Sequence, residues 1–115
     1  MVSNEDFQAF NQFNAQLSSI NAQKAQLKML IDSTKNAIEE LKESKEDSAY
    51  KNLGFIMLKV GKDKLIKDLN SEIETLNIRL KTIEKTEDLV SKKLADLQAK
   101  INAEMSSKKA ETKKE

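Results

Sequence analysis

Two heptad repeats of apolar residues, one in each half of the chain, constrain the fold more than any other feature of the sequence. The a positions of the first repeat are Phe10, Leu17, Lys24, Ile31 and Ile38, and its d positions are Phe13, Ile20, Leu27, Thr34 and Leu41. The a positions of the second repeat are Ile66, Ile73, Leu80, Glu87, Leu94 and Ile101, and its d positions are Leu69, Leu76, Ile83, Val90, Leu97 and Glu104. A narrow apolar stripe with this 3-4 spacing is typical of a coiled coil rather than of a globular core.

Turn-forming residues are scarce, which limits the number of elements. The 115 residues include no proline and two glycines, Gly54 and Gly61, both near the middle of the chain. We therefore predict a single domain with a helix over 3–46, a β-hairpin over 48–61, a helix over 63–105 and a disordered tail over 106–115. A short connection favours a second helix that returns antiparallel to the first and buries both stripes. The predicted fold class is mainly α, a long antiparallel two-helix coiled coil with a central β-hairpin.

Two charged residues, Lys24 and Glu87, lie inside the apolar stripes, and a third, Glu104, is the last d position of the second repeat. Antiparallel pairing brings Lys24 and Glu87 within about one helical turn of each other. A polar pair inside a coiled coil lowers stability but can fix the register. The alternative is that both side chains direct their charged ends to water.

The central segment breaks both heptad repeats and favours β-structure. We predict strands over 49–53 and 55–60 with a turn at Asn52–Gly54, since glycine adopts positive φ without strain. A lone hairpin is marginally stable in water, and its edges can pair with other strands. The hairpin is therefore expected to pair with hairpins of other chains, although it could also fold back on its own helices. The predicted oligomerisation residues are Tyr50, Leu53, Phe55, Ile56, Met57, Leu58 and Val60.

The composition argues against several functional classes. The sequence has no His and no Cys, which removes the usual zinc ligands and the usual nucleophile–base pairs, so we expect no metal, no cofactor and no enzymatic activity. The net charge is +1 and Arg79 is the only arginine, which argues against a nucleic-acid partner. No apolar run approaches the roughly 20 residues that cross a bilayer, and the first residues do not form a secretory signal, so we expect no membrane partner.

The order of segments resembles a β-class subunit of prefoldin. Residues 49–54 read Ala-Tyr-Lys-Asn-Leu-Gly, similar to the family's Val-Tyr-Lys-x-Val-Gly. The apolar run Phe55–Leu58 follows, and then Lys62-Asp63-Lys64, Ile73-Glu74-Thr75-Leu76 and Arg79-Leu80. Two features depart from the family pattern: Ala49 replaces a larger β-branched residue, and the acidic stretch before the hairpin has no proline.

This resemblance implies a chaperone. Prefoldins are heterohexamers of two α-class and four β-class subunits, in which the hairpins form a double β-barrel body and the coiled coils extend from it. They hold unfolded polypeptide clients without ATP and deliver them to a group II chaperonin. The resemblance thus implies α-class and other β-class prefoldin subunits as partners, and a cytoplasmic location in an archaeal or a eukaryotic cell.

Antiparallel pairing also predicts where a client would bind. Both termini meet at one tip of the coiled coil, and the predicted client-binding residues there are Phe7, Phe10, Phe13, Ile101 and Met105. A frayed tip would expose these side chains as an apolar patch. The phenylalanines could equally serve ordinary packing between the helices. A structural coiled-coil scaffold that joins specific proteins, without chaperone activity, is the alternative function.

Overall fold

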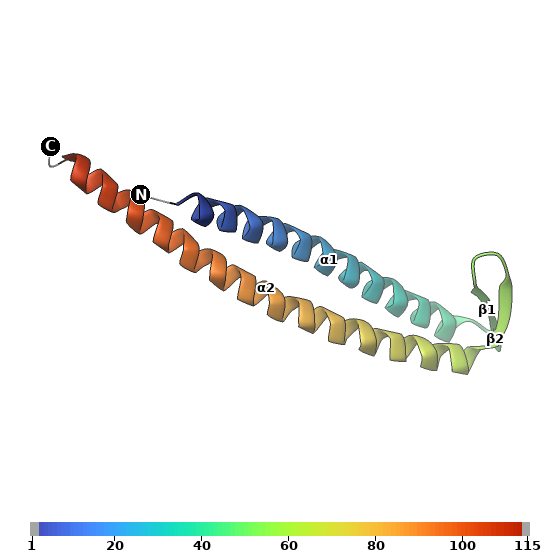
Figure 1. The fold of residues 1–115 in the computed structure, drawn as a ribbon. Coiled ribbons are helices and arrows are strands. Elements are labelled where there is room, and N and C mark those ends of the chain that lie inside the picture. The colour runs from blue at the N-terminus through green and yellow to red at the C-terminus, as the bar shows by residue number, and fades with distance from the viewer. Residues whose placement is uncertain (1–2, 114–115) are drawn as a thin grey trace. The chain divides into compact units, whose positions relative to one another are not determined.

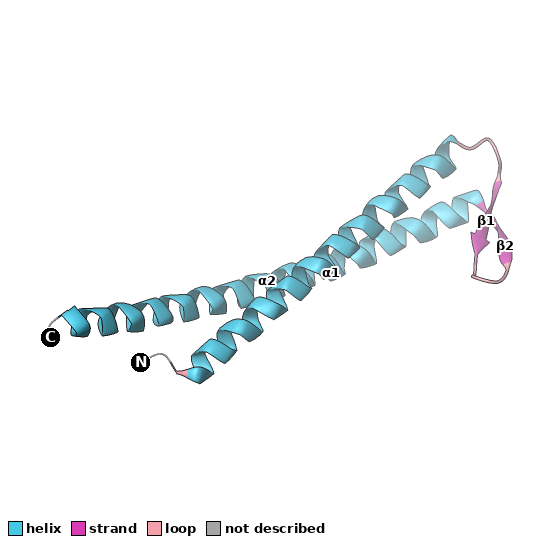
Figure 2. Ribbon diagram, turned by 90° about the horizontal axis from the view of Figure 1, so that it is seen from above, coloured by secondary structure: helices cyan, strands magenta, loops and turns pink. Residues whose placement is uncertain are grey.

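The computed structural model describes residues 3–113, with side chains described as far as Ser106. Its elements are α1 (Asn4–Glu43), β1 (Ser48–Asn52), β2 (Met57–Gly61) and α2 (Lys62–Lys113), in this order (Figure 1). The predicted fold, two long helices with a central antiparallel hairpin, is therefore confirmed (Figure 2). The chain divides into two compact units, which we name the terminal unit (1–24 with 82–115) and the hairpin unit (25–81).

Local side-chain hydrogen bonds set the ends of α1. The Asp6 backbone N–H donates to the Ser3 hydroxyl at 3.1 Å, so Ser3 caps the helix. Glu5 and Asp6 add negative charge to the first turn, where the helix dipole favours it. At the other end, the Glu46 N–H donates to the Ser44 hydroxyl at 3.2 Å. This local bond competes with helical bonding, so α1 ends at Glu43 and does not extend to the predicted residue 46.

The hairpin closes through the turn Leu53–Ile56. The Leu53 N–H donates to the Ile56 carbonyl and the Gly54 N–H donates to the Asn52 side-chain oxygen, both at 2.9 Å. Gly54 has a φ of +98°, a conformation that residues with a Cβ rarely adopt. The turn uses Phe55 and Ile56, and therefore the second strand begins at Met57 and not at Phe55 as predicted.

α2 begins directly after β2 and continues past the heptad repeat. The Lys62 N–H donates to the Asp47 carbonyl at 2.9 Å, which ties the start of α2 to the loop after α1. Residues 106–113, predicted as part of a disordered tail, are helical. Lys, Ala and Glu in this stretch have favourable helix propensities. The last two residues of that tail lie outside the described residues.

The buried side chains of both units lie at the predicted a and d positions. The buried residues of the terminal unit are Ile20, Val90 and Ile101. Those of the hairpin unit are Leu27, Ile31, Ile38 and Leu76. Each contributes about 1.5–3 kcal/mol relative to an exposed side chain. The heptad assignment thus identifies the core of each unit.

Candidate functional site

The hairpin carries a large exposed apolar surface. Phe55 is 93% exposed, although burial is the usual state of such a side chain. We define the hairpin surface as the exposed residues Tyr50, Leu53, Phe55, Ile56, Met57 and Leu58. Val60, the seventh predicted oligomerisation residue, is partly buried. An apolar surface of this kind on a small ribbon marks a site of protein–protein contact.

Residues 50–59 of the hairpin are exposed on both faces, whereas the base of the hairpin is partly buried. The register places Tyr50 opposite Lys59 and Lys51 opposite Leu58. Directly opposed residues share a face and successive residues alternate, so Tyr50 and Leu58 lie on opposite faces of the ribbon. The sheet has two strands, which leaves the outer backbone groups of each strand available to another strand. The arrangement suits strand addition from other chains.

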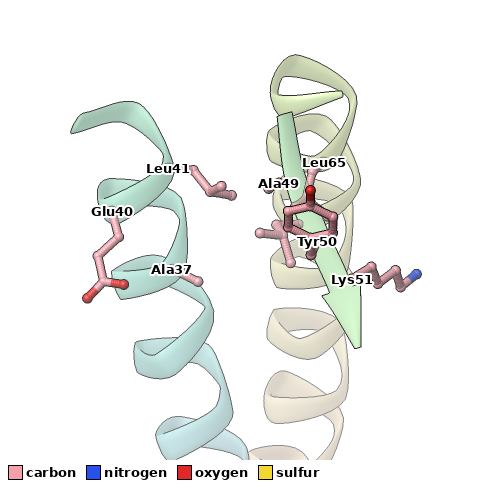
Figure 3. Close-up of a pocket in the computed structure, with 8 residues that line it drawn as sticks. Ala37, Glu40, Leu41, Ala49, Tyr50, Lys51 and Leu65 are labelled. Carbon is pink, nitrogen blue, oxygen red and sulfur yellow. The ribbon is translucent and has the colours of Figure 1, made fainter. Parts of the chain in front are cut away.

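A hollow of about 490 Å³ lies beside β1 in the hairpin unit (Figure 3). Its lining residues are Ala37, Glu40, Leu41, Ala49, Tyr50, Lys51, Leu65 and Leu69. They come from α1, β1 and α2, which are brought together by the fold alone. Sequence reasoning did not identify this hollow, because no local pattern links the three segments.

The five predicted client-binding residues, named here the terminal cluster, differ in exposure. Phe7 is 47% exposed and Met105 is 57% exposed, whereas Phe10 and Phe13 are partly buried. Ile101 is 5% exposed, because its a position packs it between the helices. An ion pair between Lys100 and Asp6, 3.3 Å long, brings the neighbours of Phe7 and Ile101 to the same end of the terminal unit. The fold thus brings the cluster to one end of the terminal unit, but only Phe7 and Met105 are well exposed to a ligand.

The two charged residues inside the heptad stripes, Lys24 and Glu87, form an ion pair. The Lys24 Nζ donates to both carboxylate oxygens of Glu87, at 3.0 and 3.2 Å. Both side chains are 21% exposed. The hydrogen bond to Glu87 raises the pKa of Lys24 above its ordinary value of 10.5, although burial opposes the shift. The predicted pairing is confirmed, and the alternative with both charged ends in water is not what the structure contains.

We expect this pair to stabilise the helix pairing in a charge-dependent way. Lys24→Glu should lower the melting temperature, because two carboxylates then face each other between the helices. Exchange of both residues, Lys24→Glu with Glu87→Lys, should restore most of the loss.

The ion pair should also make the stability depend on pH. Since the pKa of Lys24 is raised in the folded state, its contribution to the free energy of unfolding is present below pH 10.5 and is lost as pH rises through the folded pKa. Helical circular dichroism melts of all variants from pH 7 to 11 test this; an equal loss in the exchanged variant would contradict it.

Glu104 places a carboxylate at a d position next to the terminal cluster. Its Oε2 atom is buried and has no hydrogen-bond partner among the described residues. A buried polar atom without a partner costs about 1–3 kcal/mol. The heptad assignment places Glu104 at a d position but predicts no role for it.

Glu104→Leu should therefore stabilise the terminal unit by about 1 kcal/mol, because it removes the unpaired oxygen and fills the d position. The measurement is the circular dichroism melt, together with slower amide hydrogen exchange over residues 4–13. Ala103→Leu adds a similar side chain at an exposed neighbouring position and should change neither. An equal gain from both variants would show that added apolar surface, and not the d position, is responsible.

The described residues contain neither a metal site nor a membrane-spanning helix. Among the described residues, no group of three or more His, Cys, Asp or Glu side chains could hold a metal ion. Within residues 3–113, neither helix is apolar enough over a sufficient length to cross a membrane.

Comparisons with known proteins agree with this arrangement. The model of the family described as "Prefoldin subunit" matches residues 4–108. The prefoldin subunit beta of Methanospirillum hungatei is 33% identical over 99 residues, covering 85% of this chain and 82% of that protein. That of Archaeoglobus fulgidus is 36% identical over 91 residues, covering 78% of each. The crystal structure of the prefoldin beta subunit from Thermococcus strain KS-1 superposes with a TM-score of 0.77 at 27% identity, covering 90% of this chain and 94% of that one.

Proposed function

This chain belongs to the prefoldin family, and we propose that it is a β-class subunit of a heterohexameric chaperone that holds unfolded polypeptides without ATP. In this proposal its partners are α-class and other β-class prefoldin subunits. The complex works in the cytoplasm and delivers its clients to a group II chaperonin. In this proposal the chain itself binds unfolded clients and assembles with other subunits, and it catalyses no reaction.

The exposed hairpin surface is the observation that carries the proposal. Its apolar side chains are large, lie on one short hairpin and are more than two-fifths exposed in the single chain. Their burial against strands of other subunits would remove this surface from water and satisfy the open strand edges. The hollow beside β1 adds apolar residues next to the same strand, so a neighbouring subunit could also pack there.

The terminal cluster is the proposed client site. Phe7 and Met105 are the members of the cluster that a client can contact without disturbing the helix packing. An aromatic ring and a flexible thioether accept varied apolar partners, which suits a chaperone with many clients. Several such sites in one complex would compensate for weak binding at each through avidity.

Two measurements on one preparation test this function. The native mass of the complex formed with an α-class subunit should be that of a hexamer. Light scattering should then show that this complex suppresses aggregation of a chemically denatured protein, without added ATP. A hexamer that leaves aggregation unchanged would favour the scaffold function, and a chain that forms no complex would contradict both.

A further inference from the structure

After its first turn, α1 has no charged residue up to Gln23. The chain has 20 basic and 19 acidic residues, yet none of them lies in the 17-residue segment from Phe7 to Gln23. Seven residues of this segment are Asn or Gln, and all seven are exposed. The opposing part of α2 is different, since it exposes charged residues of both signs, among them Lys85, Asp88, Lys92 and Asp96. The terminal unit therefore has two different flanks: the α1 flank exposes uncharged amide groups, and the α2 flank exposes charged groups.

Five polar side chains of this segment share one face of α1, because they are separated by three or four residues. We name them the amide row: Gln8, Gln12, Gln16, Ser19 and Gln23. At a rise of 1.5 Å per residue, successive members lie about 4.5–6 Å apart along the helix. In an extended polypeptide, the backbone groups that point to one side repeat about every 6.6 Å. Flexible glutamine side chains can accommodate the small difference between these spacings.

The hydrogen-bonding capacity of the row is largely unused within the chain. Gln23 donates to the Ser19 hydroxyl at 3.4 Å. The other three glutamines have no hydrogen-bond partner among the described residues. Each glutamine side chain offers two N–H donors and a carbonyl acceptor, so the row presents both kinds of group at every step.

The row also lies next to the apolar positions of the same helix. Gln16 follows Phe13 by three residues, and Gln23 follows Ile20 by three residues, so each lies beside a d position. Phe13 is partly buried and keeps some of its ring accessible. A ligand along the row would therefore meet amide groups and an aromatic ring together.

We propose that the amide row binds the extended backbone of a non-native polypeptide, with its glutamines donating to backbone carbonyls and accepting from backbone N–H groups. This inference rests on the proposed chaperone function and identifies a second, polar surface for the same client. Every polypeptide has the same backbone, so such contacts require no particular sequence. The absence of charge matters because a client can cover this flank without the cost of desolvating ions. The exposed charges on α2 make the opposite flank less suitable.

The experiment compares two labelled, unstructured peptides of identical sequence, one of which has methyl groups on alternate backbone nitrogens. Both are titrated by fluorescence anisotropy into the assembled hexamer. The test variant changes Gln8, Gln12, Gln16 and Gln23 to Ala, which preserves helix propensity and leaves the a and d positions intact. The matched control changes Lys85, Asp88, Lys92 and Asp96 to Ala, four exposed residues of the other flank with no net change in charge.

We expect the unaltered hexamer to bind the unmethylated peptide about tenfold more tightly, since several modest hydrogen bonds act together. The test variant should lose this preference, whereas the control should keep it. An equal preference in the test variant would overturn the inference while leaving the proposed function intact. Failure of the unaltered hexamer to bind either peptide would overturn both. A change in the hexamer's native mass for the test variant would assign the row to contact with another subunit, and would also overturn the inference.

Discussion

Changing Met57 and Leu58 to Lys should leave the single chain folded but abolish its assembly with other prefoldin subunits. The two side chains are 64% and 51% exposed in the single chain and lie on opposite faces of the hairpin. Lysine at these positions can therefore reach water, and the fold of the chain loses little. In an assembled β-barrel one of the two lysines would face the enclosed interior, since successive residues of a strand alternate between interior and exterior, and burying an unpaired charge costs several kcal/mol. The expected weakening of assembly is at least about a hundredfold, since each 1.4 kcal/mol is a factor of ten.

Size-exclusion chromatography with mass measurement checks this result, and circular dichroism verifies that the variant chain remains helical. The matched control is Ser33→Lys with Asn36→Lys, which adds the same charge at exposed positions of α1 in the same unit. It should assemble normally. If the Met57 and Leu58 variant co-elutes with its partners at the full mass, the hairpin surface is not the assembly element.

The helices and their buried residues were predictable because they depend on local periodicity. A heptad stripe fixes which side chains are buried, and Ile31, Ile38 and Leu76 are buried as it requires. The opposition of Lys24 and Glu87 also followed from the antiparallel return, since residues at similar distances from the central hairpin must meet. Whether the two side chains form an ion pair depends on their geometry, and the heptad pattern does not predict that geometry.

The hairpin was harder to predict in detail. The concentration of β-favouring residues located it, and Asn52 and Gly54 both act in the turn as expected. The strand boundary was misplaced because Phe55 and Ile56 have strong β-propensity, yet the four-residue turn requires them. Propensity describes single residues, whereas the length of a turn depends on how both strands pair.

The predicted client site treated its five residues alike, although their heptad positions already distinguish them. Phe7 and Ile101 are both apolar residues near the ends of their repeats, yet Phe7 is 47% exposed and Ile101 is 5% exposed. The difference arises because Ile101 occupies an a position, whereas Phe7 lies outside the a and d positions. The uncharged segment that contains the amide row was visible in the sequence, as a run without Lys, Arg, Asp or Glu. Which of its side chains are exposed depends on the helix packing, which the structure shows.

Changing Phe7, Phe10 and Phe13 to Ser should remove most client capture while the hexamer still assembles. These residues belong to the terminal unit, whereas the hairpin surface belongs to the hairpin unit. A large apolar side chain contributes about 1.5–3 kcal/mol when it becomes fully buried against a partner. In the proposed hexamer, losses at several subunits would multiply, because its sites would act together on one client. Suppression of aggregation by hexamer of verified mass should therefore fall by at least about tenfold.

Two further variants separate loss of contact from loss of packing, because Phe10 and Phe13 also pack between the helices. Phe7→Ser with Met105→Ser removes only exposed apolar groups, so it should reduce client capture with an unchanged melting temperature. Ile20→Ala removes a buried side chain of the same unit, so it should lower the melting temperature and preserve capture. If Ile20→Ala reduces capture as strongly as the Phe7 and Met105 variant does, then the order of the helix pair, and not its exposed apolar groups, determines client binding.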